Sequence, residues 1–393
     1  MARHGATASG GVNRQALSAE EFAAWRELIE WGRTLGMTPY SDAIGNLFLR
    51  LQCGDPDAPA VLTGSHLDSQ PSGGRFDGVF GVLAGLEAVQ SIVDAGVPLA
   101  RPIEVVAWMN EEGSRFAPGM MGSAAFTGAA TPESYFEIRD GSGVSVADGL
   151  TQLRAAFPDL ERRALRRPYA AYLEAHIEQG PVLEGAGRTI GIVTGIQGKQ
   201  TFRVTVRGEE AHAGTTPRRE RKDALLAAID IIGALSSEAR DEADLVKFTV
   251  GRLVVEPNAP SVVPGRAIFS VDIRHPDSAV LARLGDAVPQ LCRAHAGPCA
   301  VEVVRLTAAP SLAFPDDVTR AIAEAAERLG LSAMRLPSAA GHDARFLNDV
   351  CPTGMIFVPC KDGISHNEAE SATPGDLAAG ARVLAEVIAQ HAR

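Results

Sequence analysis

Histidine and carboxylate side chains gather in a short stretch of the chain that can bury very little. Residues 61–78 read VLTGSHLDSQPSGGRFDG, so an apolar run is followed at once by His66, Asp68 and Asp77. Asp68 lies two residues after His66 and can orient its ring, an arrangement that is common among metal ligands. The glycines before Asp77 allow a tight turn that brings its carboxylate back toward the end of the apolar run. An aspartate in such a loop is more often a turn former, so a site here needs partners from other segments.

Three other segments place acids or histidines directly after an apolar run. They are VVAWMNEEGSRF with Glu111 and Glu112, YLEAHIEQG with His176, and MIFVPCKDGISHNEAE with His366. Adjacent carboxylates repel each other and a cation would remove that repulsion, while the pair also offers one metal ligand and one free base. With the first stretch, these side chains form a mixed nitrogen and oxygen set that suits Zn, Mn, Co or Ni, but not Ca or Mg. A transition-metal site is therefore predicted.

The elements that must position these groups alternate between apolar runs and amphipathic segments, which is typical of helices packed on a largely parallel sheet. Strands are predicted at 60–65 and 103–109, on either side of a helix that starts near GVFGVLAGLEAV. Ser18 and Glu21 predict a capping box for a first helix that ends near Gly36. Ligands of open α/β sheets bind at the carboxyl ends of the strands, which is where the candidate groups fall.

A change of pattern divides the chain. Residues 199–308 predict a β-α-β-β-α-β unit, and the first pattern returns after it with a helix over 316–329 and a strand at TGMIFVPC. We therefore predict a discontinuous catalytic α/β domain of residues 1–198 and 309–393 with a mainly parallel sheet. A smaller α+β domain of residues 199–308 is inserted into it.

The composition limits the class of protein. The chain has 393 residues, of which 46% are hydrophobic and 22% charged, as in globular proteins of about two domains. A net charge of −11 argues against nucleic acid or an anionic membrane as the main partner. We expect a cytoplasmic protein, because no apolar stretch approaches the ~20 residues of a membrane span and the first residues lack the apolar core of a signal peptide. The five cysteines contain no C-x-x-C pair, which argues against a disulfide framework or a thiolate zinc site.

Five segments, in this order, resemble the M20-type metallopeptidase superfamily. They are GSHLDSQPSGGRFDGVFGV, NEEGSRF, HIEQGPVLE, AHAGTTP and GISHNEAE. The resemblance spans nearly the whole chain and is to the hydantoinase/carbamoylase branch, which contains N-carbamoyl-L-amino-acid and allantoate amidohydrolases. Two departures are that the chain begins about one helix later than relatives usually do, and that Ser261 stands in PNAPSVVPG where many relatives carry an asparagine.

The resemblance implies a site with two divalent metal ions, Zn, Mn, Co or Ni, that share Asp77 as a ligand. The other implied ligands are His66, Glu112, His176 and His366. In two-metal sites a shared water has a pKa near neutrality. Glu111 would remain unbound and act as the general base, returning the proton to the departing nitrogen because an amine anion is a very poor leaving group.

The resemblance also implies that the inserted domain is a lid and dimerisation domain. His212 in AHAGTTP would donate a hydrogen bond to the oxyanion of the reaction. Arg274 in DIRHP would hold the substrate carboxylate with its planar fork, with Asn258 beside it. The ureido end of the substrate would be lined by Gln179, His342 and Asp343.

The expected activity is that of a homodimeric two-metal amidohydrolase, which cleaves the carbamoyl group of N-carbamoyl-L-amino acids to give the L-amino acid, CO₂ and ammonia. Allantoate is the near alternative substrate, and an aminoacylase-like or peptidase-like member is a further alternative. A non-catalytic binding protein of the same fold would be expected to lack ligands or the base. Glu111 and all five ligand candidates are present.

Overall fold

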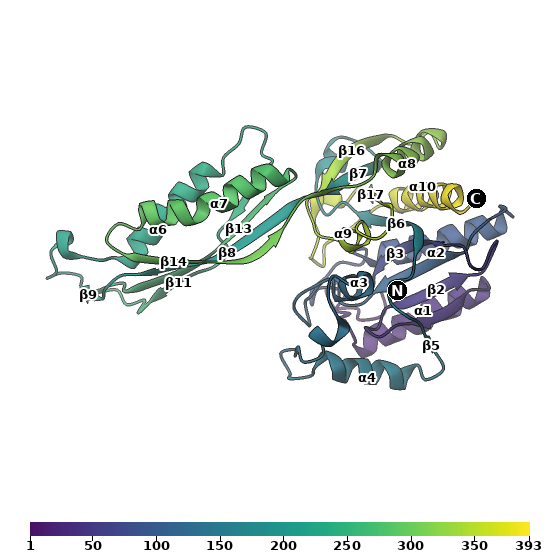
Figure 1. Ribbon diagram of the computed structural model, residues 1–393, viewed down its shortest axis with the longest axis horizontal. Coiled ribbons are helices and arrows are strands. Elements are labelled where there is room, and N and C mark those ends of the chain that lie inside the picture. Colours follow the sequence, from purple (N-terminus) through teal and green to yellow (C-terminus); the bar gives the residue numbers. More distant parts are fainter. The chain divides into compact units, whose positions relative to one another are not determined.

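The computed structural model describes the whole chain of 393 residues, which divides into two compact units (Figure 1). The first unit consists of Met1–Thr194 and Phe314–Arg393, and the second of Gly195–Ala313. The predicted insertion, 199–308, thus lies inside the second unit and is a few residues shorter at each end.

A mixed sheet forms the centre of the first unit. Its strands are β1 (Thr38–Ser41), β2 (Leu47–Leu51), β3 (Ala60–His66), β4 (Ile103–Trp108), β5 (Glu161–Arg162), β6 (Tyr169–Ile177), β7 (Ile190–Ile196), β15 (Leu312–Ala313), β16 (Ala333–Ser338) and β17 (Thr353–Val358). Their order is β15-β7-β17-β6-β3-β4-β2-β1-β5, with β16 beside β7. The central strands β17, β6, β3 and β4 are parallel, whereas β7, β2 and β1 pair antiparallel. The predicted α/β fold with a largely parallel sheet is confirmed.

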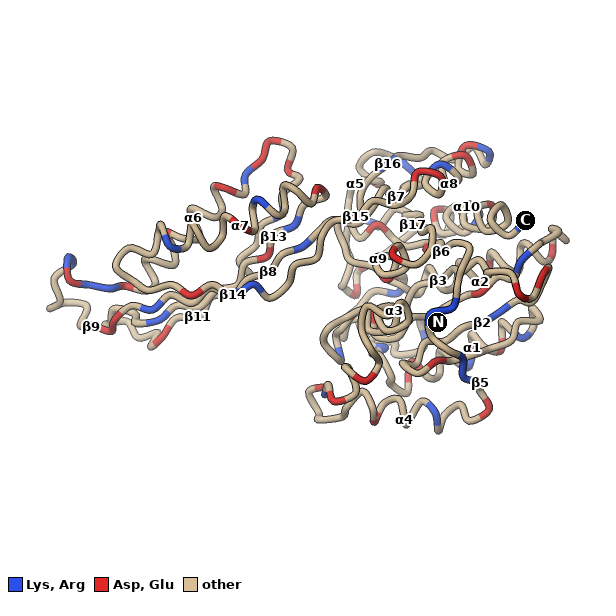
Figure 2. Tube along the Cα trace, viewed as in Figure 1, with Lys and Arg blue, Asp and Glu red and all other residues tan.

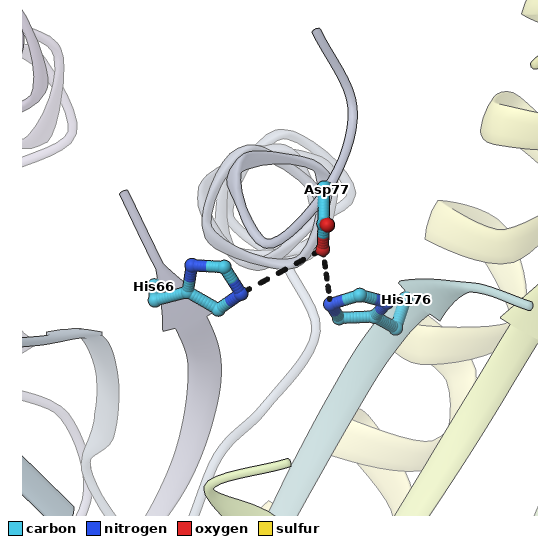
Figure 3. Close-up of side chains that lie close together, drawn as sticks. All are labelled: His66, Asp77 and His176. Atoms are coloured by element: carbon cyan, nitrogen blue, oxygen red, sulfur yellow. Dashed lines mark ion pairs between the residues drawn. The ribbon is translucent and has the colours of Figure 1, made fainter. Parts of the chain in front are cut away.

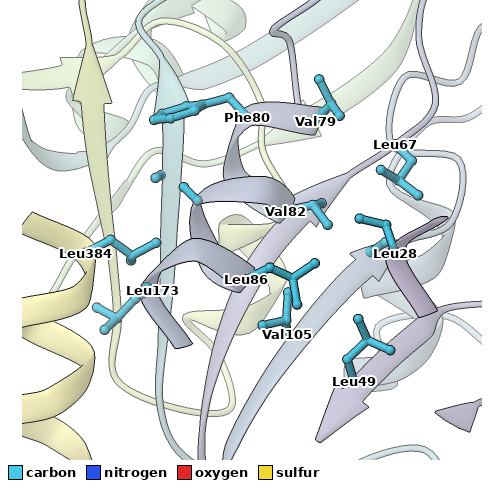
Figure 4. Packing of buried hydrophobic residues seen from close by; sticks show 14 of the residues in the cluster. Leu28, Leu49, Leu67, Val79, Phe80, Val82, Leu86, Val105, Leu173 and Leu384 are labelled. Carbon is cyan, nitrogen blue, oxygen red and sulfur yellow. The ribbon is translucent and has the colours of Figure 1, made fainter. Parts of the chain in front are cut away.

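The central strands are buried because helices cover the sheet. Every residue of β3 and β4 is buried, which explains why these strands are almost continuously apolar in sequence. The helix between them, α2 (Val79–Asp94), packs on β3, β6 and α10 (Pro374–Ala392). Figure 4 shows Leu86 of α2 close to Val105 of β4, and Leu173 of β6 close to Leu384 of α10. The same packing holds the start of α2 against the ends of the strands.

The remaining helices of the first unit begin and end at recognisable signals. They are α1 (Ala19–Thr34), α3 (Met121–Thr127), α4 (Val146–Ala156), α5 (Val182–Gly185), α8 (Asp316–Arg328), α9 (Ala344–Leu347) and the 3₁₀ turns η1 (Pro132–Ser134) and η3 (Lys361–Gly363). Ser18 caps α1 by accepting from the backbone N–H of Glu21, and Gly36 follows the helix with a φ of 76°. The predicted capping box is only half formed, because the Glu21 carboxylate accepts from the N–H of Leu17 instead of Ser18.

The second unit is an antiparallel sheet with helices on it (Figure 1). Its elements are β8 (Gly198–Arg207), β9 (Ala211–His212), η2 (Arg218–Glu220), α6 (Ala224–Glu238), β10 (Lys247–Thr249), β11 (Leu253–Glu256), β12 (Val262–Val263), β13 (Arg266–His275), α7 (Ser278–His295) and β14 (Ala300–Ala309). The sheet order is β10-β13-β8-β14, with β11 also on β13, and β9 pairs separately with β12. Alternate residues of β13 are buried, as expected for a sheet with one covered face.

Charged residues are spread over both units rather than gathered in one tract (Figure 2). The net charge of −11 is therefore a distributed excess of acids. No helix is both long enough and apolar enough to cross a membrane.

Candidate metal centre

Four neighbouring strands bring the predicted ligands to one edge of the sheet. Because β17, β6, β3 and β4 are adjacent and parallel, their carboxyl ends lie together. The side chains found there are His66 at the end of β3, Glu111 and Glu112 after β4, His176 near the end of β6 and His366 after β17. Asp77 lies just before α2, whose packing on β3 and β6 sets its position.

The carboxylate of Asp77 faces the rings of both His66 and His176 (Figure 3). Its Oδ1 is 3.8 Å from His66 Nε2 and 3.4 Å from His176 Nε2. Its Oδ2 is 3.3 Å from His366 Nε2, which is also 3.3 Å from Glu112 Oε2. The residues therefore form two donor groups, His66–Asp77–His176 and Asp77–Glu112–His366, which share Asp77.

The spacing of these atoms fits metal ions between them. A tetrahedral zinc ion with bonds of ~2.0–2.2 Å holds its ligand atoms roughly 3.3–3.6 Å apart. Direct hydrogen bonds between nitrogen and oxygen are shorter, at ~2.7–3.2 Å. Three of the four measured separations are 3.3–3.4 Å, and the fourth, between His66 and Asp77, is 3.8 Å. All four exceed a direct hydrogen bond, and the mixed imidazole and carboxylate donors suit divalent transition metals.

The two buried histidines present unprotonated Nε2 atoms to Asp77. His66 Nδ1 lies 2.9 Å from the carbonyl oxygen of Asp68, and His176 Nδ1 lies 2.9 Å from that of Ile177. A carbonyl oxygen only accepts, so each Nδ1 carries the hydrogen and each Nε2 keeps its lone pair. The backbone thus fixes the tautomer that metal binding requires.

Asp68 has a different role from the one predicted. Its carboxylate lies 3.7 Å from His66 Nδ1, and the ring is oriented by the Asp68 carbonyl oxygen instead. The two carboxylate oxygens accept the backbone N–H groups of Glu111 and Glu112, each at 3.1 Å. Asp68 therefore positions the glutamate pair, a contact that the spacing of two residues from His66 does not reveal.

Crowding of buried acids perturbs the ionisation of the cluster. Burial raises the pKa of Glu112 to about 8 and that of Glu111 well above its ordinary value, with the neighbouring carboxylates adding to both shifts. Burial opposes ionisation of Asp77 as well, but the surrounding histidines outweigh it and lower the pKa of this carboxyl. The hydrogen bond to Asp77 raises the pKa of His366 to about 9. A divalent cation would take the place of these protons and relieve the repulsion.

His342 and Asp343 are both buried in the first unit. His342 is only 2% exposed and its ring packs against that of His176, with the centroids 4.6 Å apart. Asp343 is fully buried and accepts from the hydroxyl of Ser123. The His342 ring thus supports that of His176 from within the core, and the expectation that His342 and Asp343 line the ureido end of a substrate stays a prediction.

Glu174, His176 and His342 also bring donor atoms close together. The Glu174 carboxylate, however, already accepts from Ser65 Oγ at 2.7 Å and from Tyr172 Oη at 3.0 Å. His176 belongs to the cluster around Asp77, so we interpret this group as its buried support.

Gln179 contacts the shared carboxylate. Its Nε2 donates to Asp77 Oδ2 at 3.0 Å and to Ser365 Oγ at 3.2 Å. Glu370, which sequence reasoning did not single out, accepts the backbone N–H groups of Phe76 and Asp77. Its position four residues after His366, in the same motif, was the only signal for it.

The remaining predicted residues belong to the second unit. His212 lies exposed on β9, and its Nδ1 accepts from the N–H groups of Gly214 and Thr215 at 3.0 and 3.1 Å. Its Nε2 therefore carries the hydrogen and is a donor. Arg274 on β13 binds Asp272 through Nε and Nη2, at 3.0 and 3.2 Å.

Asn258 is exposed in the turn after β11, with a φ of 57°. Ser261 contacts the loop of His212 through its backbone, since its carbonyl oxygen accepts from the N–H of Ala213 at 3.1 Å. This backbone contact does not require an asparagine at position 261.

Comparison with known proteins decides the family. The profile of peptidase family M20/M25/M40 matches residues 62–390. The chain belongs to this family. It is 41% identical to an N-carbamoyl-L-amino-acid amidohydrolase of Rhizobium meliloti, over 100% of this chain and 94% of that protein. It is 35% identical to an allantoate amidohydrolase of Bacillus subtilis, over 99% of this chain and 94% of that one.

A crystal structure supports the same assignment within the M20 family. An amidase of the hydantoinase/carbamoylase family from Burkholderia multivorans superposes with a TM-score of 0.92 at 43% identity, covering 100% of this chain and 95% of that one. The predicted membership of the hydantoinase/carbamoylase branch is confirmed.

Proposed function

We propose that this M20 protein is a two-metal amidohydrolase that removes the carbamoyl group from N-carbamoyl-L-amino acids, giving the L-amino acid, CO₂ and ammonia. The observation that carries the proposal is the pair of donor groups sharing Asp77, with donor atoms 3.3–3.8 Å apart. The full-length similarity to an N-carbamoyl-L-amino-acid amidohydrolase supports the substrate class.

His66 and His176 would hold one ion, Glu112 and His366 the other, and Asp77 both. Two divalent ions, for which we propose Zn, Mn, Co or Ni, supply Lewis-acid activation of water and of the substrate carbonyl. Glu111 would accept the proton of the attacking water and deliver it to the leaving nitrogen. Its Oε2 lies 3.5 Å from His66 Nε2, so its carboxylate faces the donor cluster, while Glu112 is held by Gln70 Nε2 at 2.8 Å.

Residues of the second unit would bind the rest of the substrate. The Nε2–H of His212 is the proposed donor to the oxyanion, a contact typically worth about 3 kcal/mol in the transition state. Arg274 is the proposed partner of the substrate carboxylate, with Asn258 beside it, and Asp272 sets the plane of its guanidinium. Gln179, which contacts Asp77, would face the ureido group.

We also propose that the second unit forms a homodimer. β14 ends the sheet order and has ten residues, so one side of a long strand is available for pairing. Leu306 on this strand is 57% exposed. A second copy could pair with β14 about a two-fold axis, which satisfies both strand edges at once.

Allantoate remains the second candidate substrate, because an allantoate amidohydrolase is similar over 94% of its length. A non-catalytic role is opposed by the presence of Glu111 together with all five ligand residues. The deciding experiment assays the metal-free protein and the protein loaded with Zn, Mn, Co or Ni against carbamoyl amino acids, allantoate and acetyl amino acids. We expect metal-dependent release of ammonia that is fastest with a carbamoyl amino acid. Faster turnover of allantoate would reassign the substrate, and no metal-dependent turnover of any of them would refute the proposal.

A further inference from the structure

Two loops far apart in the sequence meet at the metal centre through one buried carboxylate. Glu370 is 1% exposed and lies in the loop after β17 that also carries His366. Its Oε1 accepts the backbone N–H groups of Phe76 and Asp77, at 2.9 and 3.0 Å. Its Oε2 accepts the hydroxyl of Ser365 at 2.9 Å. The same side chain therefore holds the backbone of one proposed ligand and the residue next to another.

The carboxylate is closely packed as well as hydrogen-bonded. A Cβ atom added at Gly74 would lie 2.0 Å from both Cδ and Oε1 of Glu370. Only a residue without a side chain leaves room for the carboxylate in this place. The hydroxyl of Ser365 donates to Glu370, and its oxygen accepts a hydrogen bond from Gln179 Nε2. The same Gln179 amide group also donates to Asp77 Oδ2. Glu370 is thus the anchor of a network that reaches the backbone N–H and the Oδ2 atom of Asp77.

The loops that it joins have no regular structure of their own to hold them. His366 lies outside any helix or strand, with a φ of 52°, and Asp77 lies in the turn before α2. The pair Asp77 Oδ2 and His366 Nε2 must stay 3.3 Å apart to act as ligands of one ion. Ligand positions that drift by more than about 0.5 Å lose productive geometry, so such a site requires support from outside the ligand set.

We propose that Glu370 is a positioning residue that sets the separation of Asp77 and His366 and so determines the affinity of the site for its divalent metal. The inference rests on the proposed metal site. Partners of metal ligands typically contribute ~10–100-fold to metal affinity, and we expect an effect of this size from Glu370.

The test measures metal affinity directly rather than activity. The full-length protein and its variants are titrated with Zn²⁺ in competition with a chromogenic chelator, and the absorption spectrum of the Co²⁺ form reports the ligand geometry. Glu370→Ala is expected to weaken binding by ~10–100-fold and to change the Co²⁺ spectrum. Glu370→Gln is expected to recover most of the affinity, because its amide oxygen still accepts both backbone N–H groups.

Asp140 provides a matched control. Its Oδ1 also accepts two backbone N–H groups, those of Ser142 and Val144, and the hydroxyl of Ser142. Its Oδ2 accepts from Arg115 Nε at 2.9 Å, so Asp140 also contacts a residue near the glutamate pair without contacting a proposed ligand. Asp140→Ala should leave metal affinity and the Co²⁺ spectrum unchanged, even where it lowers the melting temperature of the metal-free protein.

Gly74→Ala gives an independent test, since the added methyl group must displace the Glu370 carboxylate. It should weaken metal binding and change the Co²⁺ spectrum, as Glu370→Ala does. Wild-type affinity in Glu370→Ala, or a loss equal to that of Asp140→Ala, would overturn the inference while leaving the proposed function intact. A wild type that binds no divalent ion would refute the metal site and this inference together.

Discussion

The adjacent acids Glu111 and Glu112 are proposed to do different work, and two isosteric substitutions separate the roles. Glu111→Gln and Glu112→Gln each replace one carboxylate oxygen by an amide nitrogen. The backbone of both residues is held by Asp68, whose oxygens accept the two N–H groups at 3.1 Å. Neither substitution touches these hydrogen bonds, so the turn itself should be retained in both variants.

The expected losses follow from the contacts of the two carboxylates. Glu111 is proposed as the base, and removal of a general base typically costs ~10²–10⁴-fold in rate, or about 3–6 kcal/mol at 1.4 kcal/mol per factor of ten. Glu112 Oε2 is 3.3 Å from His366 Nε2 and belongs to the donor group. Loss of a residue that only hydrogen-bonds to a metal ligand typically weakens metal binding by ~10–100-fold. Replacement of the charged ligand Glu112 itself by a neutral amide should weaken it by at least as much.

Metal content after dialysis and kcat at rising metal concentration distinguish the two cases. Glu111→Gln should retain two ions per chain and stay slow at any metal concentration. Glu112→Gln should lose metal on dialysis and regain part of its kcat when metal is added in excess. Equal loss of metal from both variants, or rescue of Glu111→Gln by excess metal, would refute the assignment of Glu111 as the base.

The remaining predictions concern substrate binding, pH and assembly. Arg274→Ala should lower kcat/KM about 10²-fold for a carbamoyl amino acid, equal to about 3 kcal/mol, and Arg274→Lys should recover part of this; an equal loss on the substrate amide, which lacks the carboxylate, would make Arg274 structural. Burial raises the pKa of Glu21 from 4.5 to about 8, so its protonated form stabilises the fold fully below about pH 4.5 and that stability is lost as the pH rises to about 8. We therefore expect the free energy of unfolding of Glu21→Gln, measured by urea denaturation, to rise relative to that of the wild type by up to about 1.4 kcal/mol per pH unit between pH 5 and 8. If the difference between the two free energies stayed constant over this range, the raised pKa of Glu21 would be contradicted. Leu306→Asp should convert the proposed dimer to monomers in sedimentation velocity while Val350→Asp, at a similarly exposed position of the first unit, does not; a monomeric wild type or an unchanged dimer would rule out pairing at β14.

The elements around the site could be predicted because their signals are local. The strands at 60–65 and 103–109 are apolar runs, and they correspond to β3 (Ala60–His66) and β4 (Ile103–Trp108). A fully buried strand must be apolar on both faces, so its sequence reveals it without any knowledge of its neighbours. The half-formed capping box at Ser18 shows the limit of such signals, because the buried Glu21 carboxylate turns to Leu17 for its hydrogen bond.

The interactions that hold the site could not be read in the same way. Asp68 follows His66 by two residues, and this spacing suggested a contact with the ring, yet its carboxylate accepts from Glu111 and Glu112. The position of an N–H group 43 residues away depends on how β4 lies beside β3, which no local pattern encodes. The burial of His342 is a comparable case, since GHDA in the sequence does not tell a core residue from a surface one.

The sequence by itself determined which side-chain types are available to a metal and that they follow the ends of apolar strands. Residue type and distance from a strand end are local properties, so His66, Asp77 and Glu112 could be named without coordinates. Only the tertiary structure decided which oxygen of Asp77 faces His176 and which faces His366, and that Glu370 joins the loop of Asp77 to that of His366. These contacts link segments nearly 300 residues apart through atoms a few ångströms from each other. Such distances are set by the packing of strands and helices, because a hydrogen bond or a metal ligand depends on position in space and not on separation along the chain.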